Sequence, residues 1–115
     1  MLAINKIAEV CHENNRAYCE SVGDFSNPPW RFVTEEKQKL IESGVRFHLA
    51  NPDANPKSSH EKWVTDHQAA GWVYGKVKDE DKKTHPSMVP YGELSQHEKT
   101  KDYLFTAMVN TLKGM

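Results

Sequence analysis

An internal repeat is the feature that most limits what this chain can fold into. Four short segments of the first half recur in the second half in the same order. They are His12-Glu13 with His60-Glu61, Gly23 with Gly71, Pro28 with Pro90, and Glu36-Lys37 with Glu98-Lys99. The first two pairs are offset by 48 residues and the last two by 62, so the second copy carries 14 extra residues between its glycine and its proline. Two units that cannot each bury an apolar face alone are expected to pack around a pseudo-two-fold axis.

Each copy is predicted to form two helices joined by a loop. Apolar residues follow a 3.6-residue period over residues 3–22, with Asn15 as the one polar member of the stripe. Thr34 is predicted to cap a second helix that reaches Asn51-Pro52, and Ser59 to cap a third helix that ends near Ala70. A capping box, Ser95-x-x-Glu98, predicts the start of the last helix.

The extra residues of the second copy predict a small β-hairpin. Residues 72–77 alternate as a strand does, residues 79–83 form a charged turn, and residues 88–91 could return as a second strand. Pro90 lacks an amide donor and would keep that strand at an edge. We therefore expect a mainly α-helical (α+β) fold in a single domain over residues 1–115. It would comprise a degenerate repeat (3–51), a linker (52–58) and a second repeat (59–113).

Composition excludes several classes of function. The 115 residues include 15 Lys+Arg and 16 Asp+Glu, so no basic excess favours nucleic acid as a partner. No apolar run approaches the roughly 18 residues of a membrane span, and the first residues lack the apolar core of a signal peptide. Cys11 and Cys19 would lie about 12 Å apart on one helix, too far for a disulfide. Reduced thiols indicate a cytoplasmic protein, in the bacterial host cytosol if a phage encodes it.

Catalytic and metal-binding patterns are missing. The run from His60 to His67 does not have the HExxH spacing of zinc proteases, and the chain has no Cys-x-x-Cys pair. The acidic residues 79–81 lack the glycine and glutamate that a calcium loop needs. The two His-Glu pairs are adjacent on helices and do not face each other, so we expect each histidine to bond across the repeat interface. We predict no enzyme, no catalytic residue, no metal and no cofactor.

Aromatic residues are dense for so thin a core, and two readings of them stay open. They could fill the space between short helices, or they could stack on a purine while nearby lysines and histidines meet phosphate groups, among them Lys78. The candidate ligand-binding residues are Trp30, Trp63, His67, Trp72, Tyr74, Lys76, His85 and Tyr91.

The second copy carries four motifs in a characteristic order. They are His60-Glu61-Lys62-Trp63, residues 71–75 (GWVYG), residues 85–91 (HPSMVPY) and Glu98-Lys99. Together they resemble the ryanodine-receptor repeat, or RyR domain, over residues 59–113. Met88 replaces a usual leucine, and the first copy has Asn15 and Asp24 where the second has Trp63 and Trp72. The resemblance implies a small stand-alone member, of a kind found in bacteria and their viruses and thought to sense nucleotide-like ligands.

From these observations we expect a non-catalytic protein that binds a small nucleotide-derived anion. The ligand would be of the ADP-ribose, cyclic-nucleotide or adenine-nucleotide class, held in an aromatic cleft between the repeats. Without an effector domain, the protein could act by sequestering a host defence signal. The alternative is a protein-interaction module that docks a partner, or a second copy of itself, through the hairpin and exposed aromatic residues.

Overall fold

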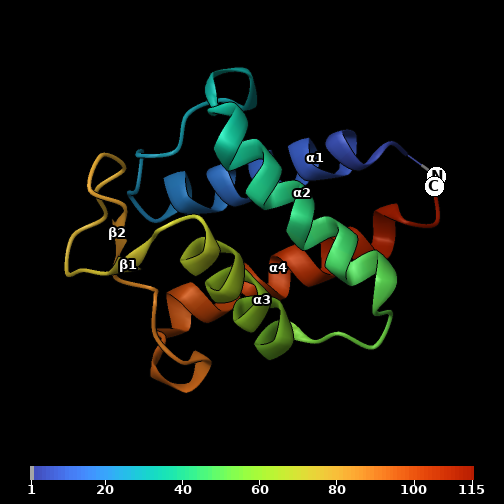
Figure 1. The fold of residues 1–115 in the computed structure, drawn as a ribbon. Helices are drawn as coiled ribbons and strands as arrows, with labels where there is room; N and C mark the ends of the chain where they lie inside the picture. The colour runs from blue at the N-terminus through green and yellow to red at the C-terminus, as the bar shows by residue number, and fades with distance from the viewer. Residues whose placement is uncertain (1) are drawn as a thin grey trace.

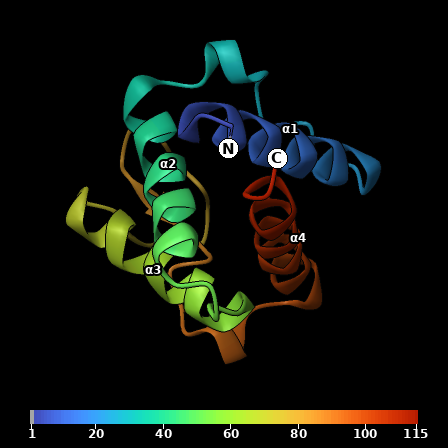
Figure 2. The same cartoon turned by 90° about the vertical axis from the view of Figure 1, so that its right-hand side faces the viewer.

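The computed structural model describes residues 2–115, which form four α-helices joined by loops. The helices are α1 (Ile4–Ser21), α2 (Glu35–Ala50), α3 (Pro56–Ala69) and α4 (Gln96–Leu112) (Figure 1). Short 3-10 helices, Trp30–Phe32 and Tyr91–Glu93, precede α2 and α4. Both α1 and α3 pack against α2 and against α4, so the four helices surround a common centre (Figure 2). The predicted mainly helical class is confirmed.

Polar side chains at the predicted caps start two of the helices. Thr34 Oγ1 accepts a hydrogen bond from the Lys37 amide at 3.2 Å, and Ser95 Oγ accepts one from the Glu98 amide at 3.2 Å. These contacts satisfy amides in the first turn that have no partner within the helix.

The predicted start of α3 is wrong. Asn55, not Ser59, caps this helix: Asn55 Oδ1 accepts from the Ser58 amide at 2.9 Å, and Ser58 Oγ accepts from the Asn55 amide at 2.8 Å. Pro56 then occupies the first helical position, where its fixed φ suits the helix and its missing N–H costs nothing. The predicted linker over residues 52–58 therefore ends at Asn55.

The structure corrects the offset between the second helices of the two halves. The caps Thr34 and Ser95 are 61 residues apart, and so are Trp30 and Tyr91, which begin the two 3-10 helices. An offset of 61 replaces 62, and the second copy therefore has 13 extra residues. Cap geometry sets where each helix begins, so the Glu-Lys match at 62 is not a structural correspondence.

The paired histidines hold the loops of their own halves. His12 Nε2 donates to the Pro28 carbonyl at 2.7 Å, and His60 Nε2 donates to the Val89 carbonyl at 2.7 Å. Each imidazole also packs on the aromatic residue two positions after its acceptor, His12 on Trp30 and His60 on Tyr91. The predicted bonds across the repeat interface are wrong, because each acceptor lies in the loop that follows the histidine's own helix.

The predicted β-hairpin is wrong in register and direction. Strands β1 (Val73–Tyr74) and β2 (Thr84–His85) pair in parallel at one end of the helical body (Figure 1). A Cβ on Gly75 would lie 2.6 Å from Thr84 Cβ, so the close approach of the two segments requires glycine. Residues 88–91 do not form a strand, since the Val89 carbonyl bonds to His60 and Tyr91 begins a 3-10 helix.

The apolar core lies between α1, α2 and α4. Its buried members are Ile7, Ala8, Cys11, Val45 and Val109. Cys11 and Cys19 are both free and buried, and burial raises the pKa of the Cys11 thiol to about 12. Among residues 2–115, no helix combines the length and apolar character that crossing a bilayer demands.

Candidate functional site

A cavity of about 190 Å³ lies at the centre of the four helices. Most of its lining comes in pairs of corresponding positions, one from each half. At an offset of 48 residues the pairs are Cys11 and Ser59, His12 and His60, and Asn15 and Trp63. At an offset of 61 residues they are Lys37 and Glu98, Leu40 and Lys101, Ile41 and Asp102, and Gly44 and Phe105. The cavity therefore forms where the two halves meet.

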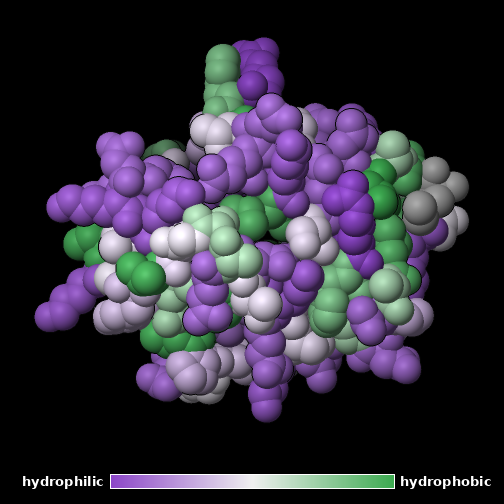
Figure 3. Space-filling view, viewed as in Figure 1, coloured by the Kyte–Doolittle hydropathy of each residue, from purple (hydrophilic) through white to green (hydrophobic). Residues whose placement is uncertain are grey.

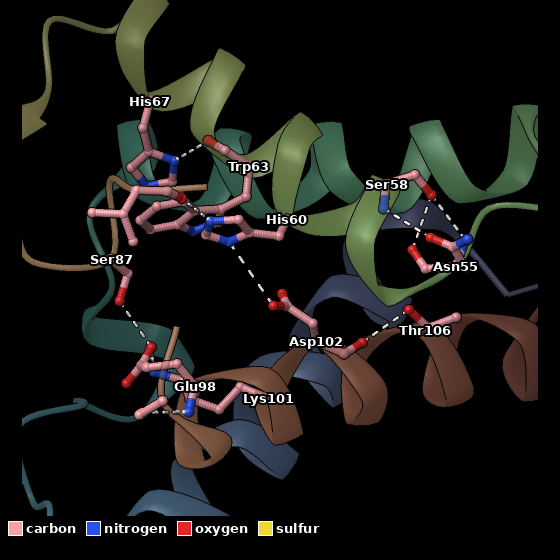
Figure 4. A network of polar contacts seen from close by, with 12 residues as sticks. Asn55, Ser58, His60, Trp63, His67, Ser87, Glu98, Lys101, Asp102 and Thr106 are labelled. Carbon is pink, nitrogen blue, oxygen red and sulfur yellow. Dashed lines mark hydrogen bonds and ion pairs between the residues drawn. The ribbon is translucent and has the colours of Figure 1, made fainter. Parts of the chain in front are cut away.

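Aromatic rings from α3 form one wall of the cavity. Trp63 stacks on His67 with ring centroids 4.0 Å apart and on His60 at 5.7 Å, and His85 meets it edge-on at 4.9 Å. Figure 4 shows His67 and His60 beside the indole of Trp63. Because neighbouring rings already lie against it, Trp63 offers an incoming base less free surface than an exposed tryptophan would.

Three lysines from separate segments line the same cavity: Lys37 from α2, Lys78 from the loop after β1, and Lys101 from α4. The Lys37 ammonium lies 4.9 Å from the centre of the Trp72 ring. Burial first, and then the charge of Lys78, lowers the pKa of Lys37 to about 8. The cavity thus brings three ammonium groups together. Lys101 pairs with Glu98 at 3.5 Å and Lys78 with Glu80 at 3.8 Å, while Lys37 has no carboxylate oxygen within 4.0 Å among residues 2–115.

Burial, together with the nearby lysine charges, keeps two histidines neutral. Burial, followed by the charge of Lys37, lowers the pKa of His67 to about 4. Burial, followed by the charges of Lys78, Lys37 and Lys101, lowers the pKa of His85 to about 3. Near neutral pH both imidazoles are therefore uncharged.

Hydrogen bonds set which nitrogen of each imidazole carries the proton. His67 Nδ1 donates to the Trp63 carbonyl at 2.8 Å, which leaves Nε2, buried and without a partner, as an acceptor. His85 Nδ1 accepts from the Ser87 amide at 3.0 Å, which puts the proton on Nε2. One histidine therefore offers an acceptor and the other a donor.

Carboxyl groups gather on the α4 side of the cavity. Asp102 Oδ2 lies 3.9 Å from His60 Nδ1, and burial, followed by the charge of Glu98, raises the pKa of Asp102 to about 7. Glu98 accepts from Ser87 Oγ at 2.9 Å and pairs with Lys101 at 3.5 Å (Figure 4). At neutral pH a large share of Asp102 is protonated, so this wall repels an anion less than two carboxylates would.

The structure divides the predicted ligand-binding residues into three groups. Trp63, His67 and His85 line the cavity. Trp72 is buried behind it at 3% exposure, Trp30 packs against the apolar core, and Tyr91 lies against His60. Tyr74, 55% exposed, and Lys76, also exposed, lie outside the lining.

The sequence interpretation missed several residues of the lining, chiefly Lys37, Lys101, Asn14, Asn15 and Asn27. Asn15 had a signal, because it interrupts the apolar stripe of α1 and corresponds to Trp63. Lys37 and Lys101 follow the cap residues Thr34 and Ser95 by three and six positions, and only the rotation of each helix shows that they turn inward.

Within residues 2–115, His, Cys, Asp and Glu side chains form no group of three or more suited to a metal ion. In a comparison with known protein families, the family model described as "RyR domain" matches residues 51–115. That segment is more than half of the chain and supplies α3, α4, both strands and the aromatic wall of the cavity.

Proposed function

This chain belongs to the RyR domain family, and from that premise we propose that it binds a small nucleotide-derived anion in the central cavity. The ligand would be of the ADP-ribose, cyclic-nucleotide or adenine-nucleotide class. The observation that carries the proposal is the convergence of Lys37, Lys78 and Lys101 on one cavity between the repeats.

Charge supports an anion over a neutral ligand. Lys78 pairs with Glu80 and Lys101 with Glu98, whereas Lys37 has no carboxylate partner among residues 2–115, so an anion beside Lys37 would supply the missing negative charge. Burial first, and then the charge of Lys78, lowers the pKa of Lys37 to about 8. Lysine ammonium groups bind phosphate oxygens as point charges, and each charge-assisted hydrogen bond is stronger than a neutral one.

Cavity size supports binding of part of a nucleotide. Pockets that enclose drug-sized ligands span roughly 300–1,000 Å³, whereas this cavity has about 190 Å³. We propose that a phosphate or a phosphate-bearing sugar occupies the cavity and that the rest of the ligand extends outward past Lys78. His67 Nε2 and His85 Nε2–H would then supply one acceptor and one donor for its hydroxyl groups.

The proposed activity is binding without turnover. The Cys11 thiol, with a pKa near 12, is a poor nucleophile, and neutral His67 donates to a backbone carbonyl. A protein of this kind would act by holding its ligand, for instance by sequestering a defence signal in a bacterial cytoplasm if a phage encodes it.

A thermal-shift screen tests the proposal. The purified protein is melted with ADP-ribose, cyclic ADP-ribose, ATP and cyclic dinucleotides, with adenosine as the uncharged control. A ligand present at 100 times its Kd adds about 2.7 kcal/mol of stability, a shift of several degrees for a domain of this size. A stabilising nucleotide with no effect of adenosine is the expected result, whereas adenosine and nucleotides stabilising equally would contradict an anion site.

Exposed apolar residues favour one alternative, a protein-docking surface. Val73, Tyr74 and Val77 are 55–74% exposed on and beside β1. The face of the molecule seen in Figure 3 has hydrophobic areas interrupted by hydrophilic side chains, which fits a partner interface less well than a continuous patch would. If Val77→Ser abolished capture of a partner or self-association while nucleotides gave no shift, the alternative would replace the proposal.

A further inference from the structure

Lys37 differs from the other two lysines of the cavity, because Lys78 pairs with Glu80 and Lys101 with Glu98. Among residues 2–115 no Asp or Glu oxygen lies within 4.0 Å of its ammonium nitrogen, although Glu36 is its neighbour in the chain. Glu36 instead pairs with Lys83 at 3.1 Å. The Lys37 ammonium nitrogen instead lies over the face of the Trp72 ring, 4.9 Å from the ring centre.

The surroundings of Lys37 raise its share of free amine. Burial is the largest cause of the lowered pKa; the charges of Lys78 and Lys101 lower the pKa further, while those of Glu80 and Glu36 raise it. With a pKa of about 8 in place of 10.5, the fraction of free amine at pH 7 is about 300-fold larger than in an ordinary lysine. Lysines activated by burial and by a second cation are nucleophiles toward carbonyl carbon.

We propose that Lys37 is a carbonyl-reactive amine that forms an imine with anionic aldehydes entering the central cavity. The Nζ lone pair attacks the carbonyl carbon, and the C=O π electrons move to oxygen. A proton then passes from nitrogen to oxygen to give a carbinolamine. Loss of the hydroxyl group with a second proton releases water and leaves C=N, so amine and aldehyde give imine and water with no oxidant or reductant.

Other residues of the cavity supply what this reaction needs. The ammonium groups of Lys78 and Lys101 would hold the anionic part of the aldehyde. The Asp102 carboxyl lines the same cavity and has a pKa of about 7, so near neutral pH it can give or accept the proton that leaves with water.

This inference rests on the proposed function and narrows it. Among nucleotide-derived ligands, those with a free reducing sugar open to an aldehyde and could bind covalently, whereas ATP and cyclic dinucleotides could not. A reversible imine would lengthen the lifetime of the complex and would suit a protein that retains its ligand.

The test uses pyridoxal 5′-phosphate, a phosphate-bearing aldehyde, followed by borohydride reduction and peptide mass spectrometry. Lys76 is the matched control lysine, because it is exposed and lies outside the cavity. We expect labelling at Lys37 at pH 7 to exceed that at Lys76 by about tenfold or more, and to rise with a midpoint near pH 8. Pyridoxal, which lacks the phosphate, should label Lys37 less than pyridoxal 5′-phosphate does.

Two variants complete the experiment. Lys37→Arg keeps the charge but cannot form an imine, and should lose the adduct while still melting in one cooperative transition. Lys76→Arg should keep the adduct at Lys37. Equal labelling of Lys37 and Lys76, or no preference for the phosphate-bearing aldehyde, would overturn the inference. If ATP stabilised the protein while these labelling results failed, the cavity would bind anions without forming an imine.

Discussion

The two halves of this protein share a frame and differ in what they contribute to the cavity. His12 and His60 donate to loop carbonyls at the same distance, and Thr34 and Ser95 cap the following helices in the same way. All four contacts involve the backbone. Residues that bond to backbone set the positions of helices and loops, and these residues match between the halves.

The positions that face the cavity have diverged. At the corresponding positions the first half has Asn15, Leu40 and Ile41, and the second has Trp63, Lys101 and Asp102. The first half contributes one charged residue to the lining, Lys37, whereas the second contributes the aromatic wall and most of the charges. The frame is therefore a property of both halves, and most of the binding chemistry is a property of the second.

Trp72 and its counterpart Asp24 should show the largest contrast between the halves. Trp72 is 3% exposed and packs against His67 and beneath Lys37, so Trp72→Ala should destabilise the protein by about 3–5 kcal/mol. Asp24 accepts one exposed hydrogen bond from the Ser26 amide, and Asp24→Ala should cost about 1 kcal/mol or less. Urea unfolding of both variants measures the difference, and equal losses would mean that Trp72 is not part of the core.

Asp102 makes the folding stability depend on pH, whereas Ile41, at the corresponding position of the first half, has no group that titrates. The folded state keeps the Asp102 proton up to a pKa of about 7, while the ordinary pKa of an aspartate is 3.8, so between these values unfolding releases a proton and stability falls as pH rises. Asp102→Asn removes this dependence. The stability of the variant relative to the wild type should therefore rise from pH 5 to pH 7, by up to about 1.4 kcal/mol per pH unit.

Denaturant unfolding at pH 5, 6 and 7 measures this effect, with Asp53→Asn, an exposed carboxyl, as the control. A constant difference between Asp102→Asn and the wild type would show that Asp102 is ionised throughout the range.

His48 and Val109 occupy corresponding positions in α2 and α4 and are both fully buried. Val109 suits the apolar core, whereas both ring nitrogens of His48 are buried without a partner and burial lowers its pKa. His48→Leu should therefore stabilise the protein by about 1–2 kcal/mol at pH 7. A thermal melt checks this, and a loss of stability would indicate that the imidazole has a partner, such as a buried water.

The first helices of the two halves begin differently, and this contrast should have the smallest effect. Asn55 caps α3 through a capping box, while Ala3 precedes α1 without a side-chain cap. Asn55→Ala should cost about 1 kcal/mol and Ala3→Ser should add about 0.5 kcal/mol or more. Urea unfolding would contradict this view of the caps if both substitutions shifted stability in the same direction.

Local patterns predicted the helical frame well. The apolar period located α1, and the caps Thr34 and Ser95 located α2 and α4, because each depends on residues a few positions apart. The start of α3 was predicted wrongly because the prediction placed its cap at Ser59, whereas Asn55, four residues earlier and followed by Pro56, caps the helix.

Long-range features could not be predicted in the same way. The parallel pairing of β1 with β2 depends on how closely Gly75 approaches Thr84, which is a tertiary contact. Cavity membership depends on the rotation of each helix about its axis, so Trp63, His67 and His85 were identified while Lys37 and Lys101 were missed. Lys76 and Lys78 are two residues apart, and only the second reaches the cavity.

These two lysines provide the most direct test of the central claim that the cavity between the halves binds an anion. The measurement is a calorimetric titration of ADP-ribose into the wild type, Lys78→Met and Lys76→Met. Lys78 lines the cavity, whereas Lys76, on the same loop, is exposed outside it. Lys78→Met is expected to weaken binding by about 1–2 kcal/mol, and Lys76→Met to bind as the wild type does. Equal weakening by both variants, or loss only in Lys76→Met, would place the anion on the outer surface and contradict a binding site in the cavity.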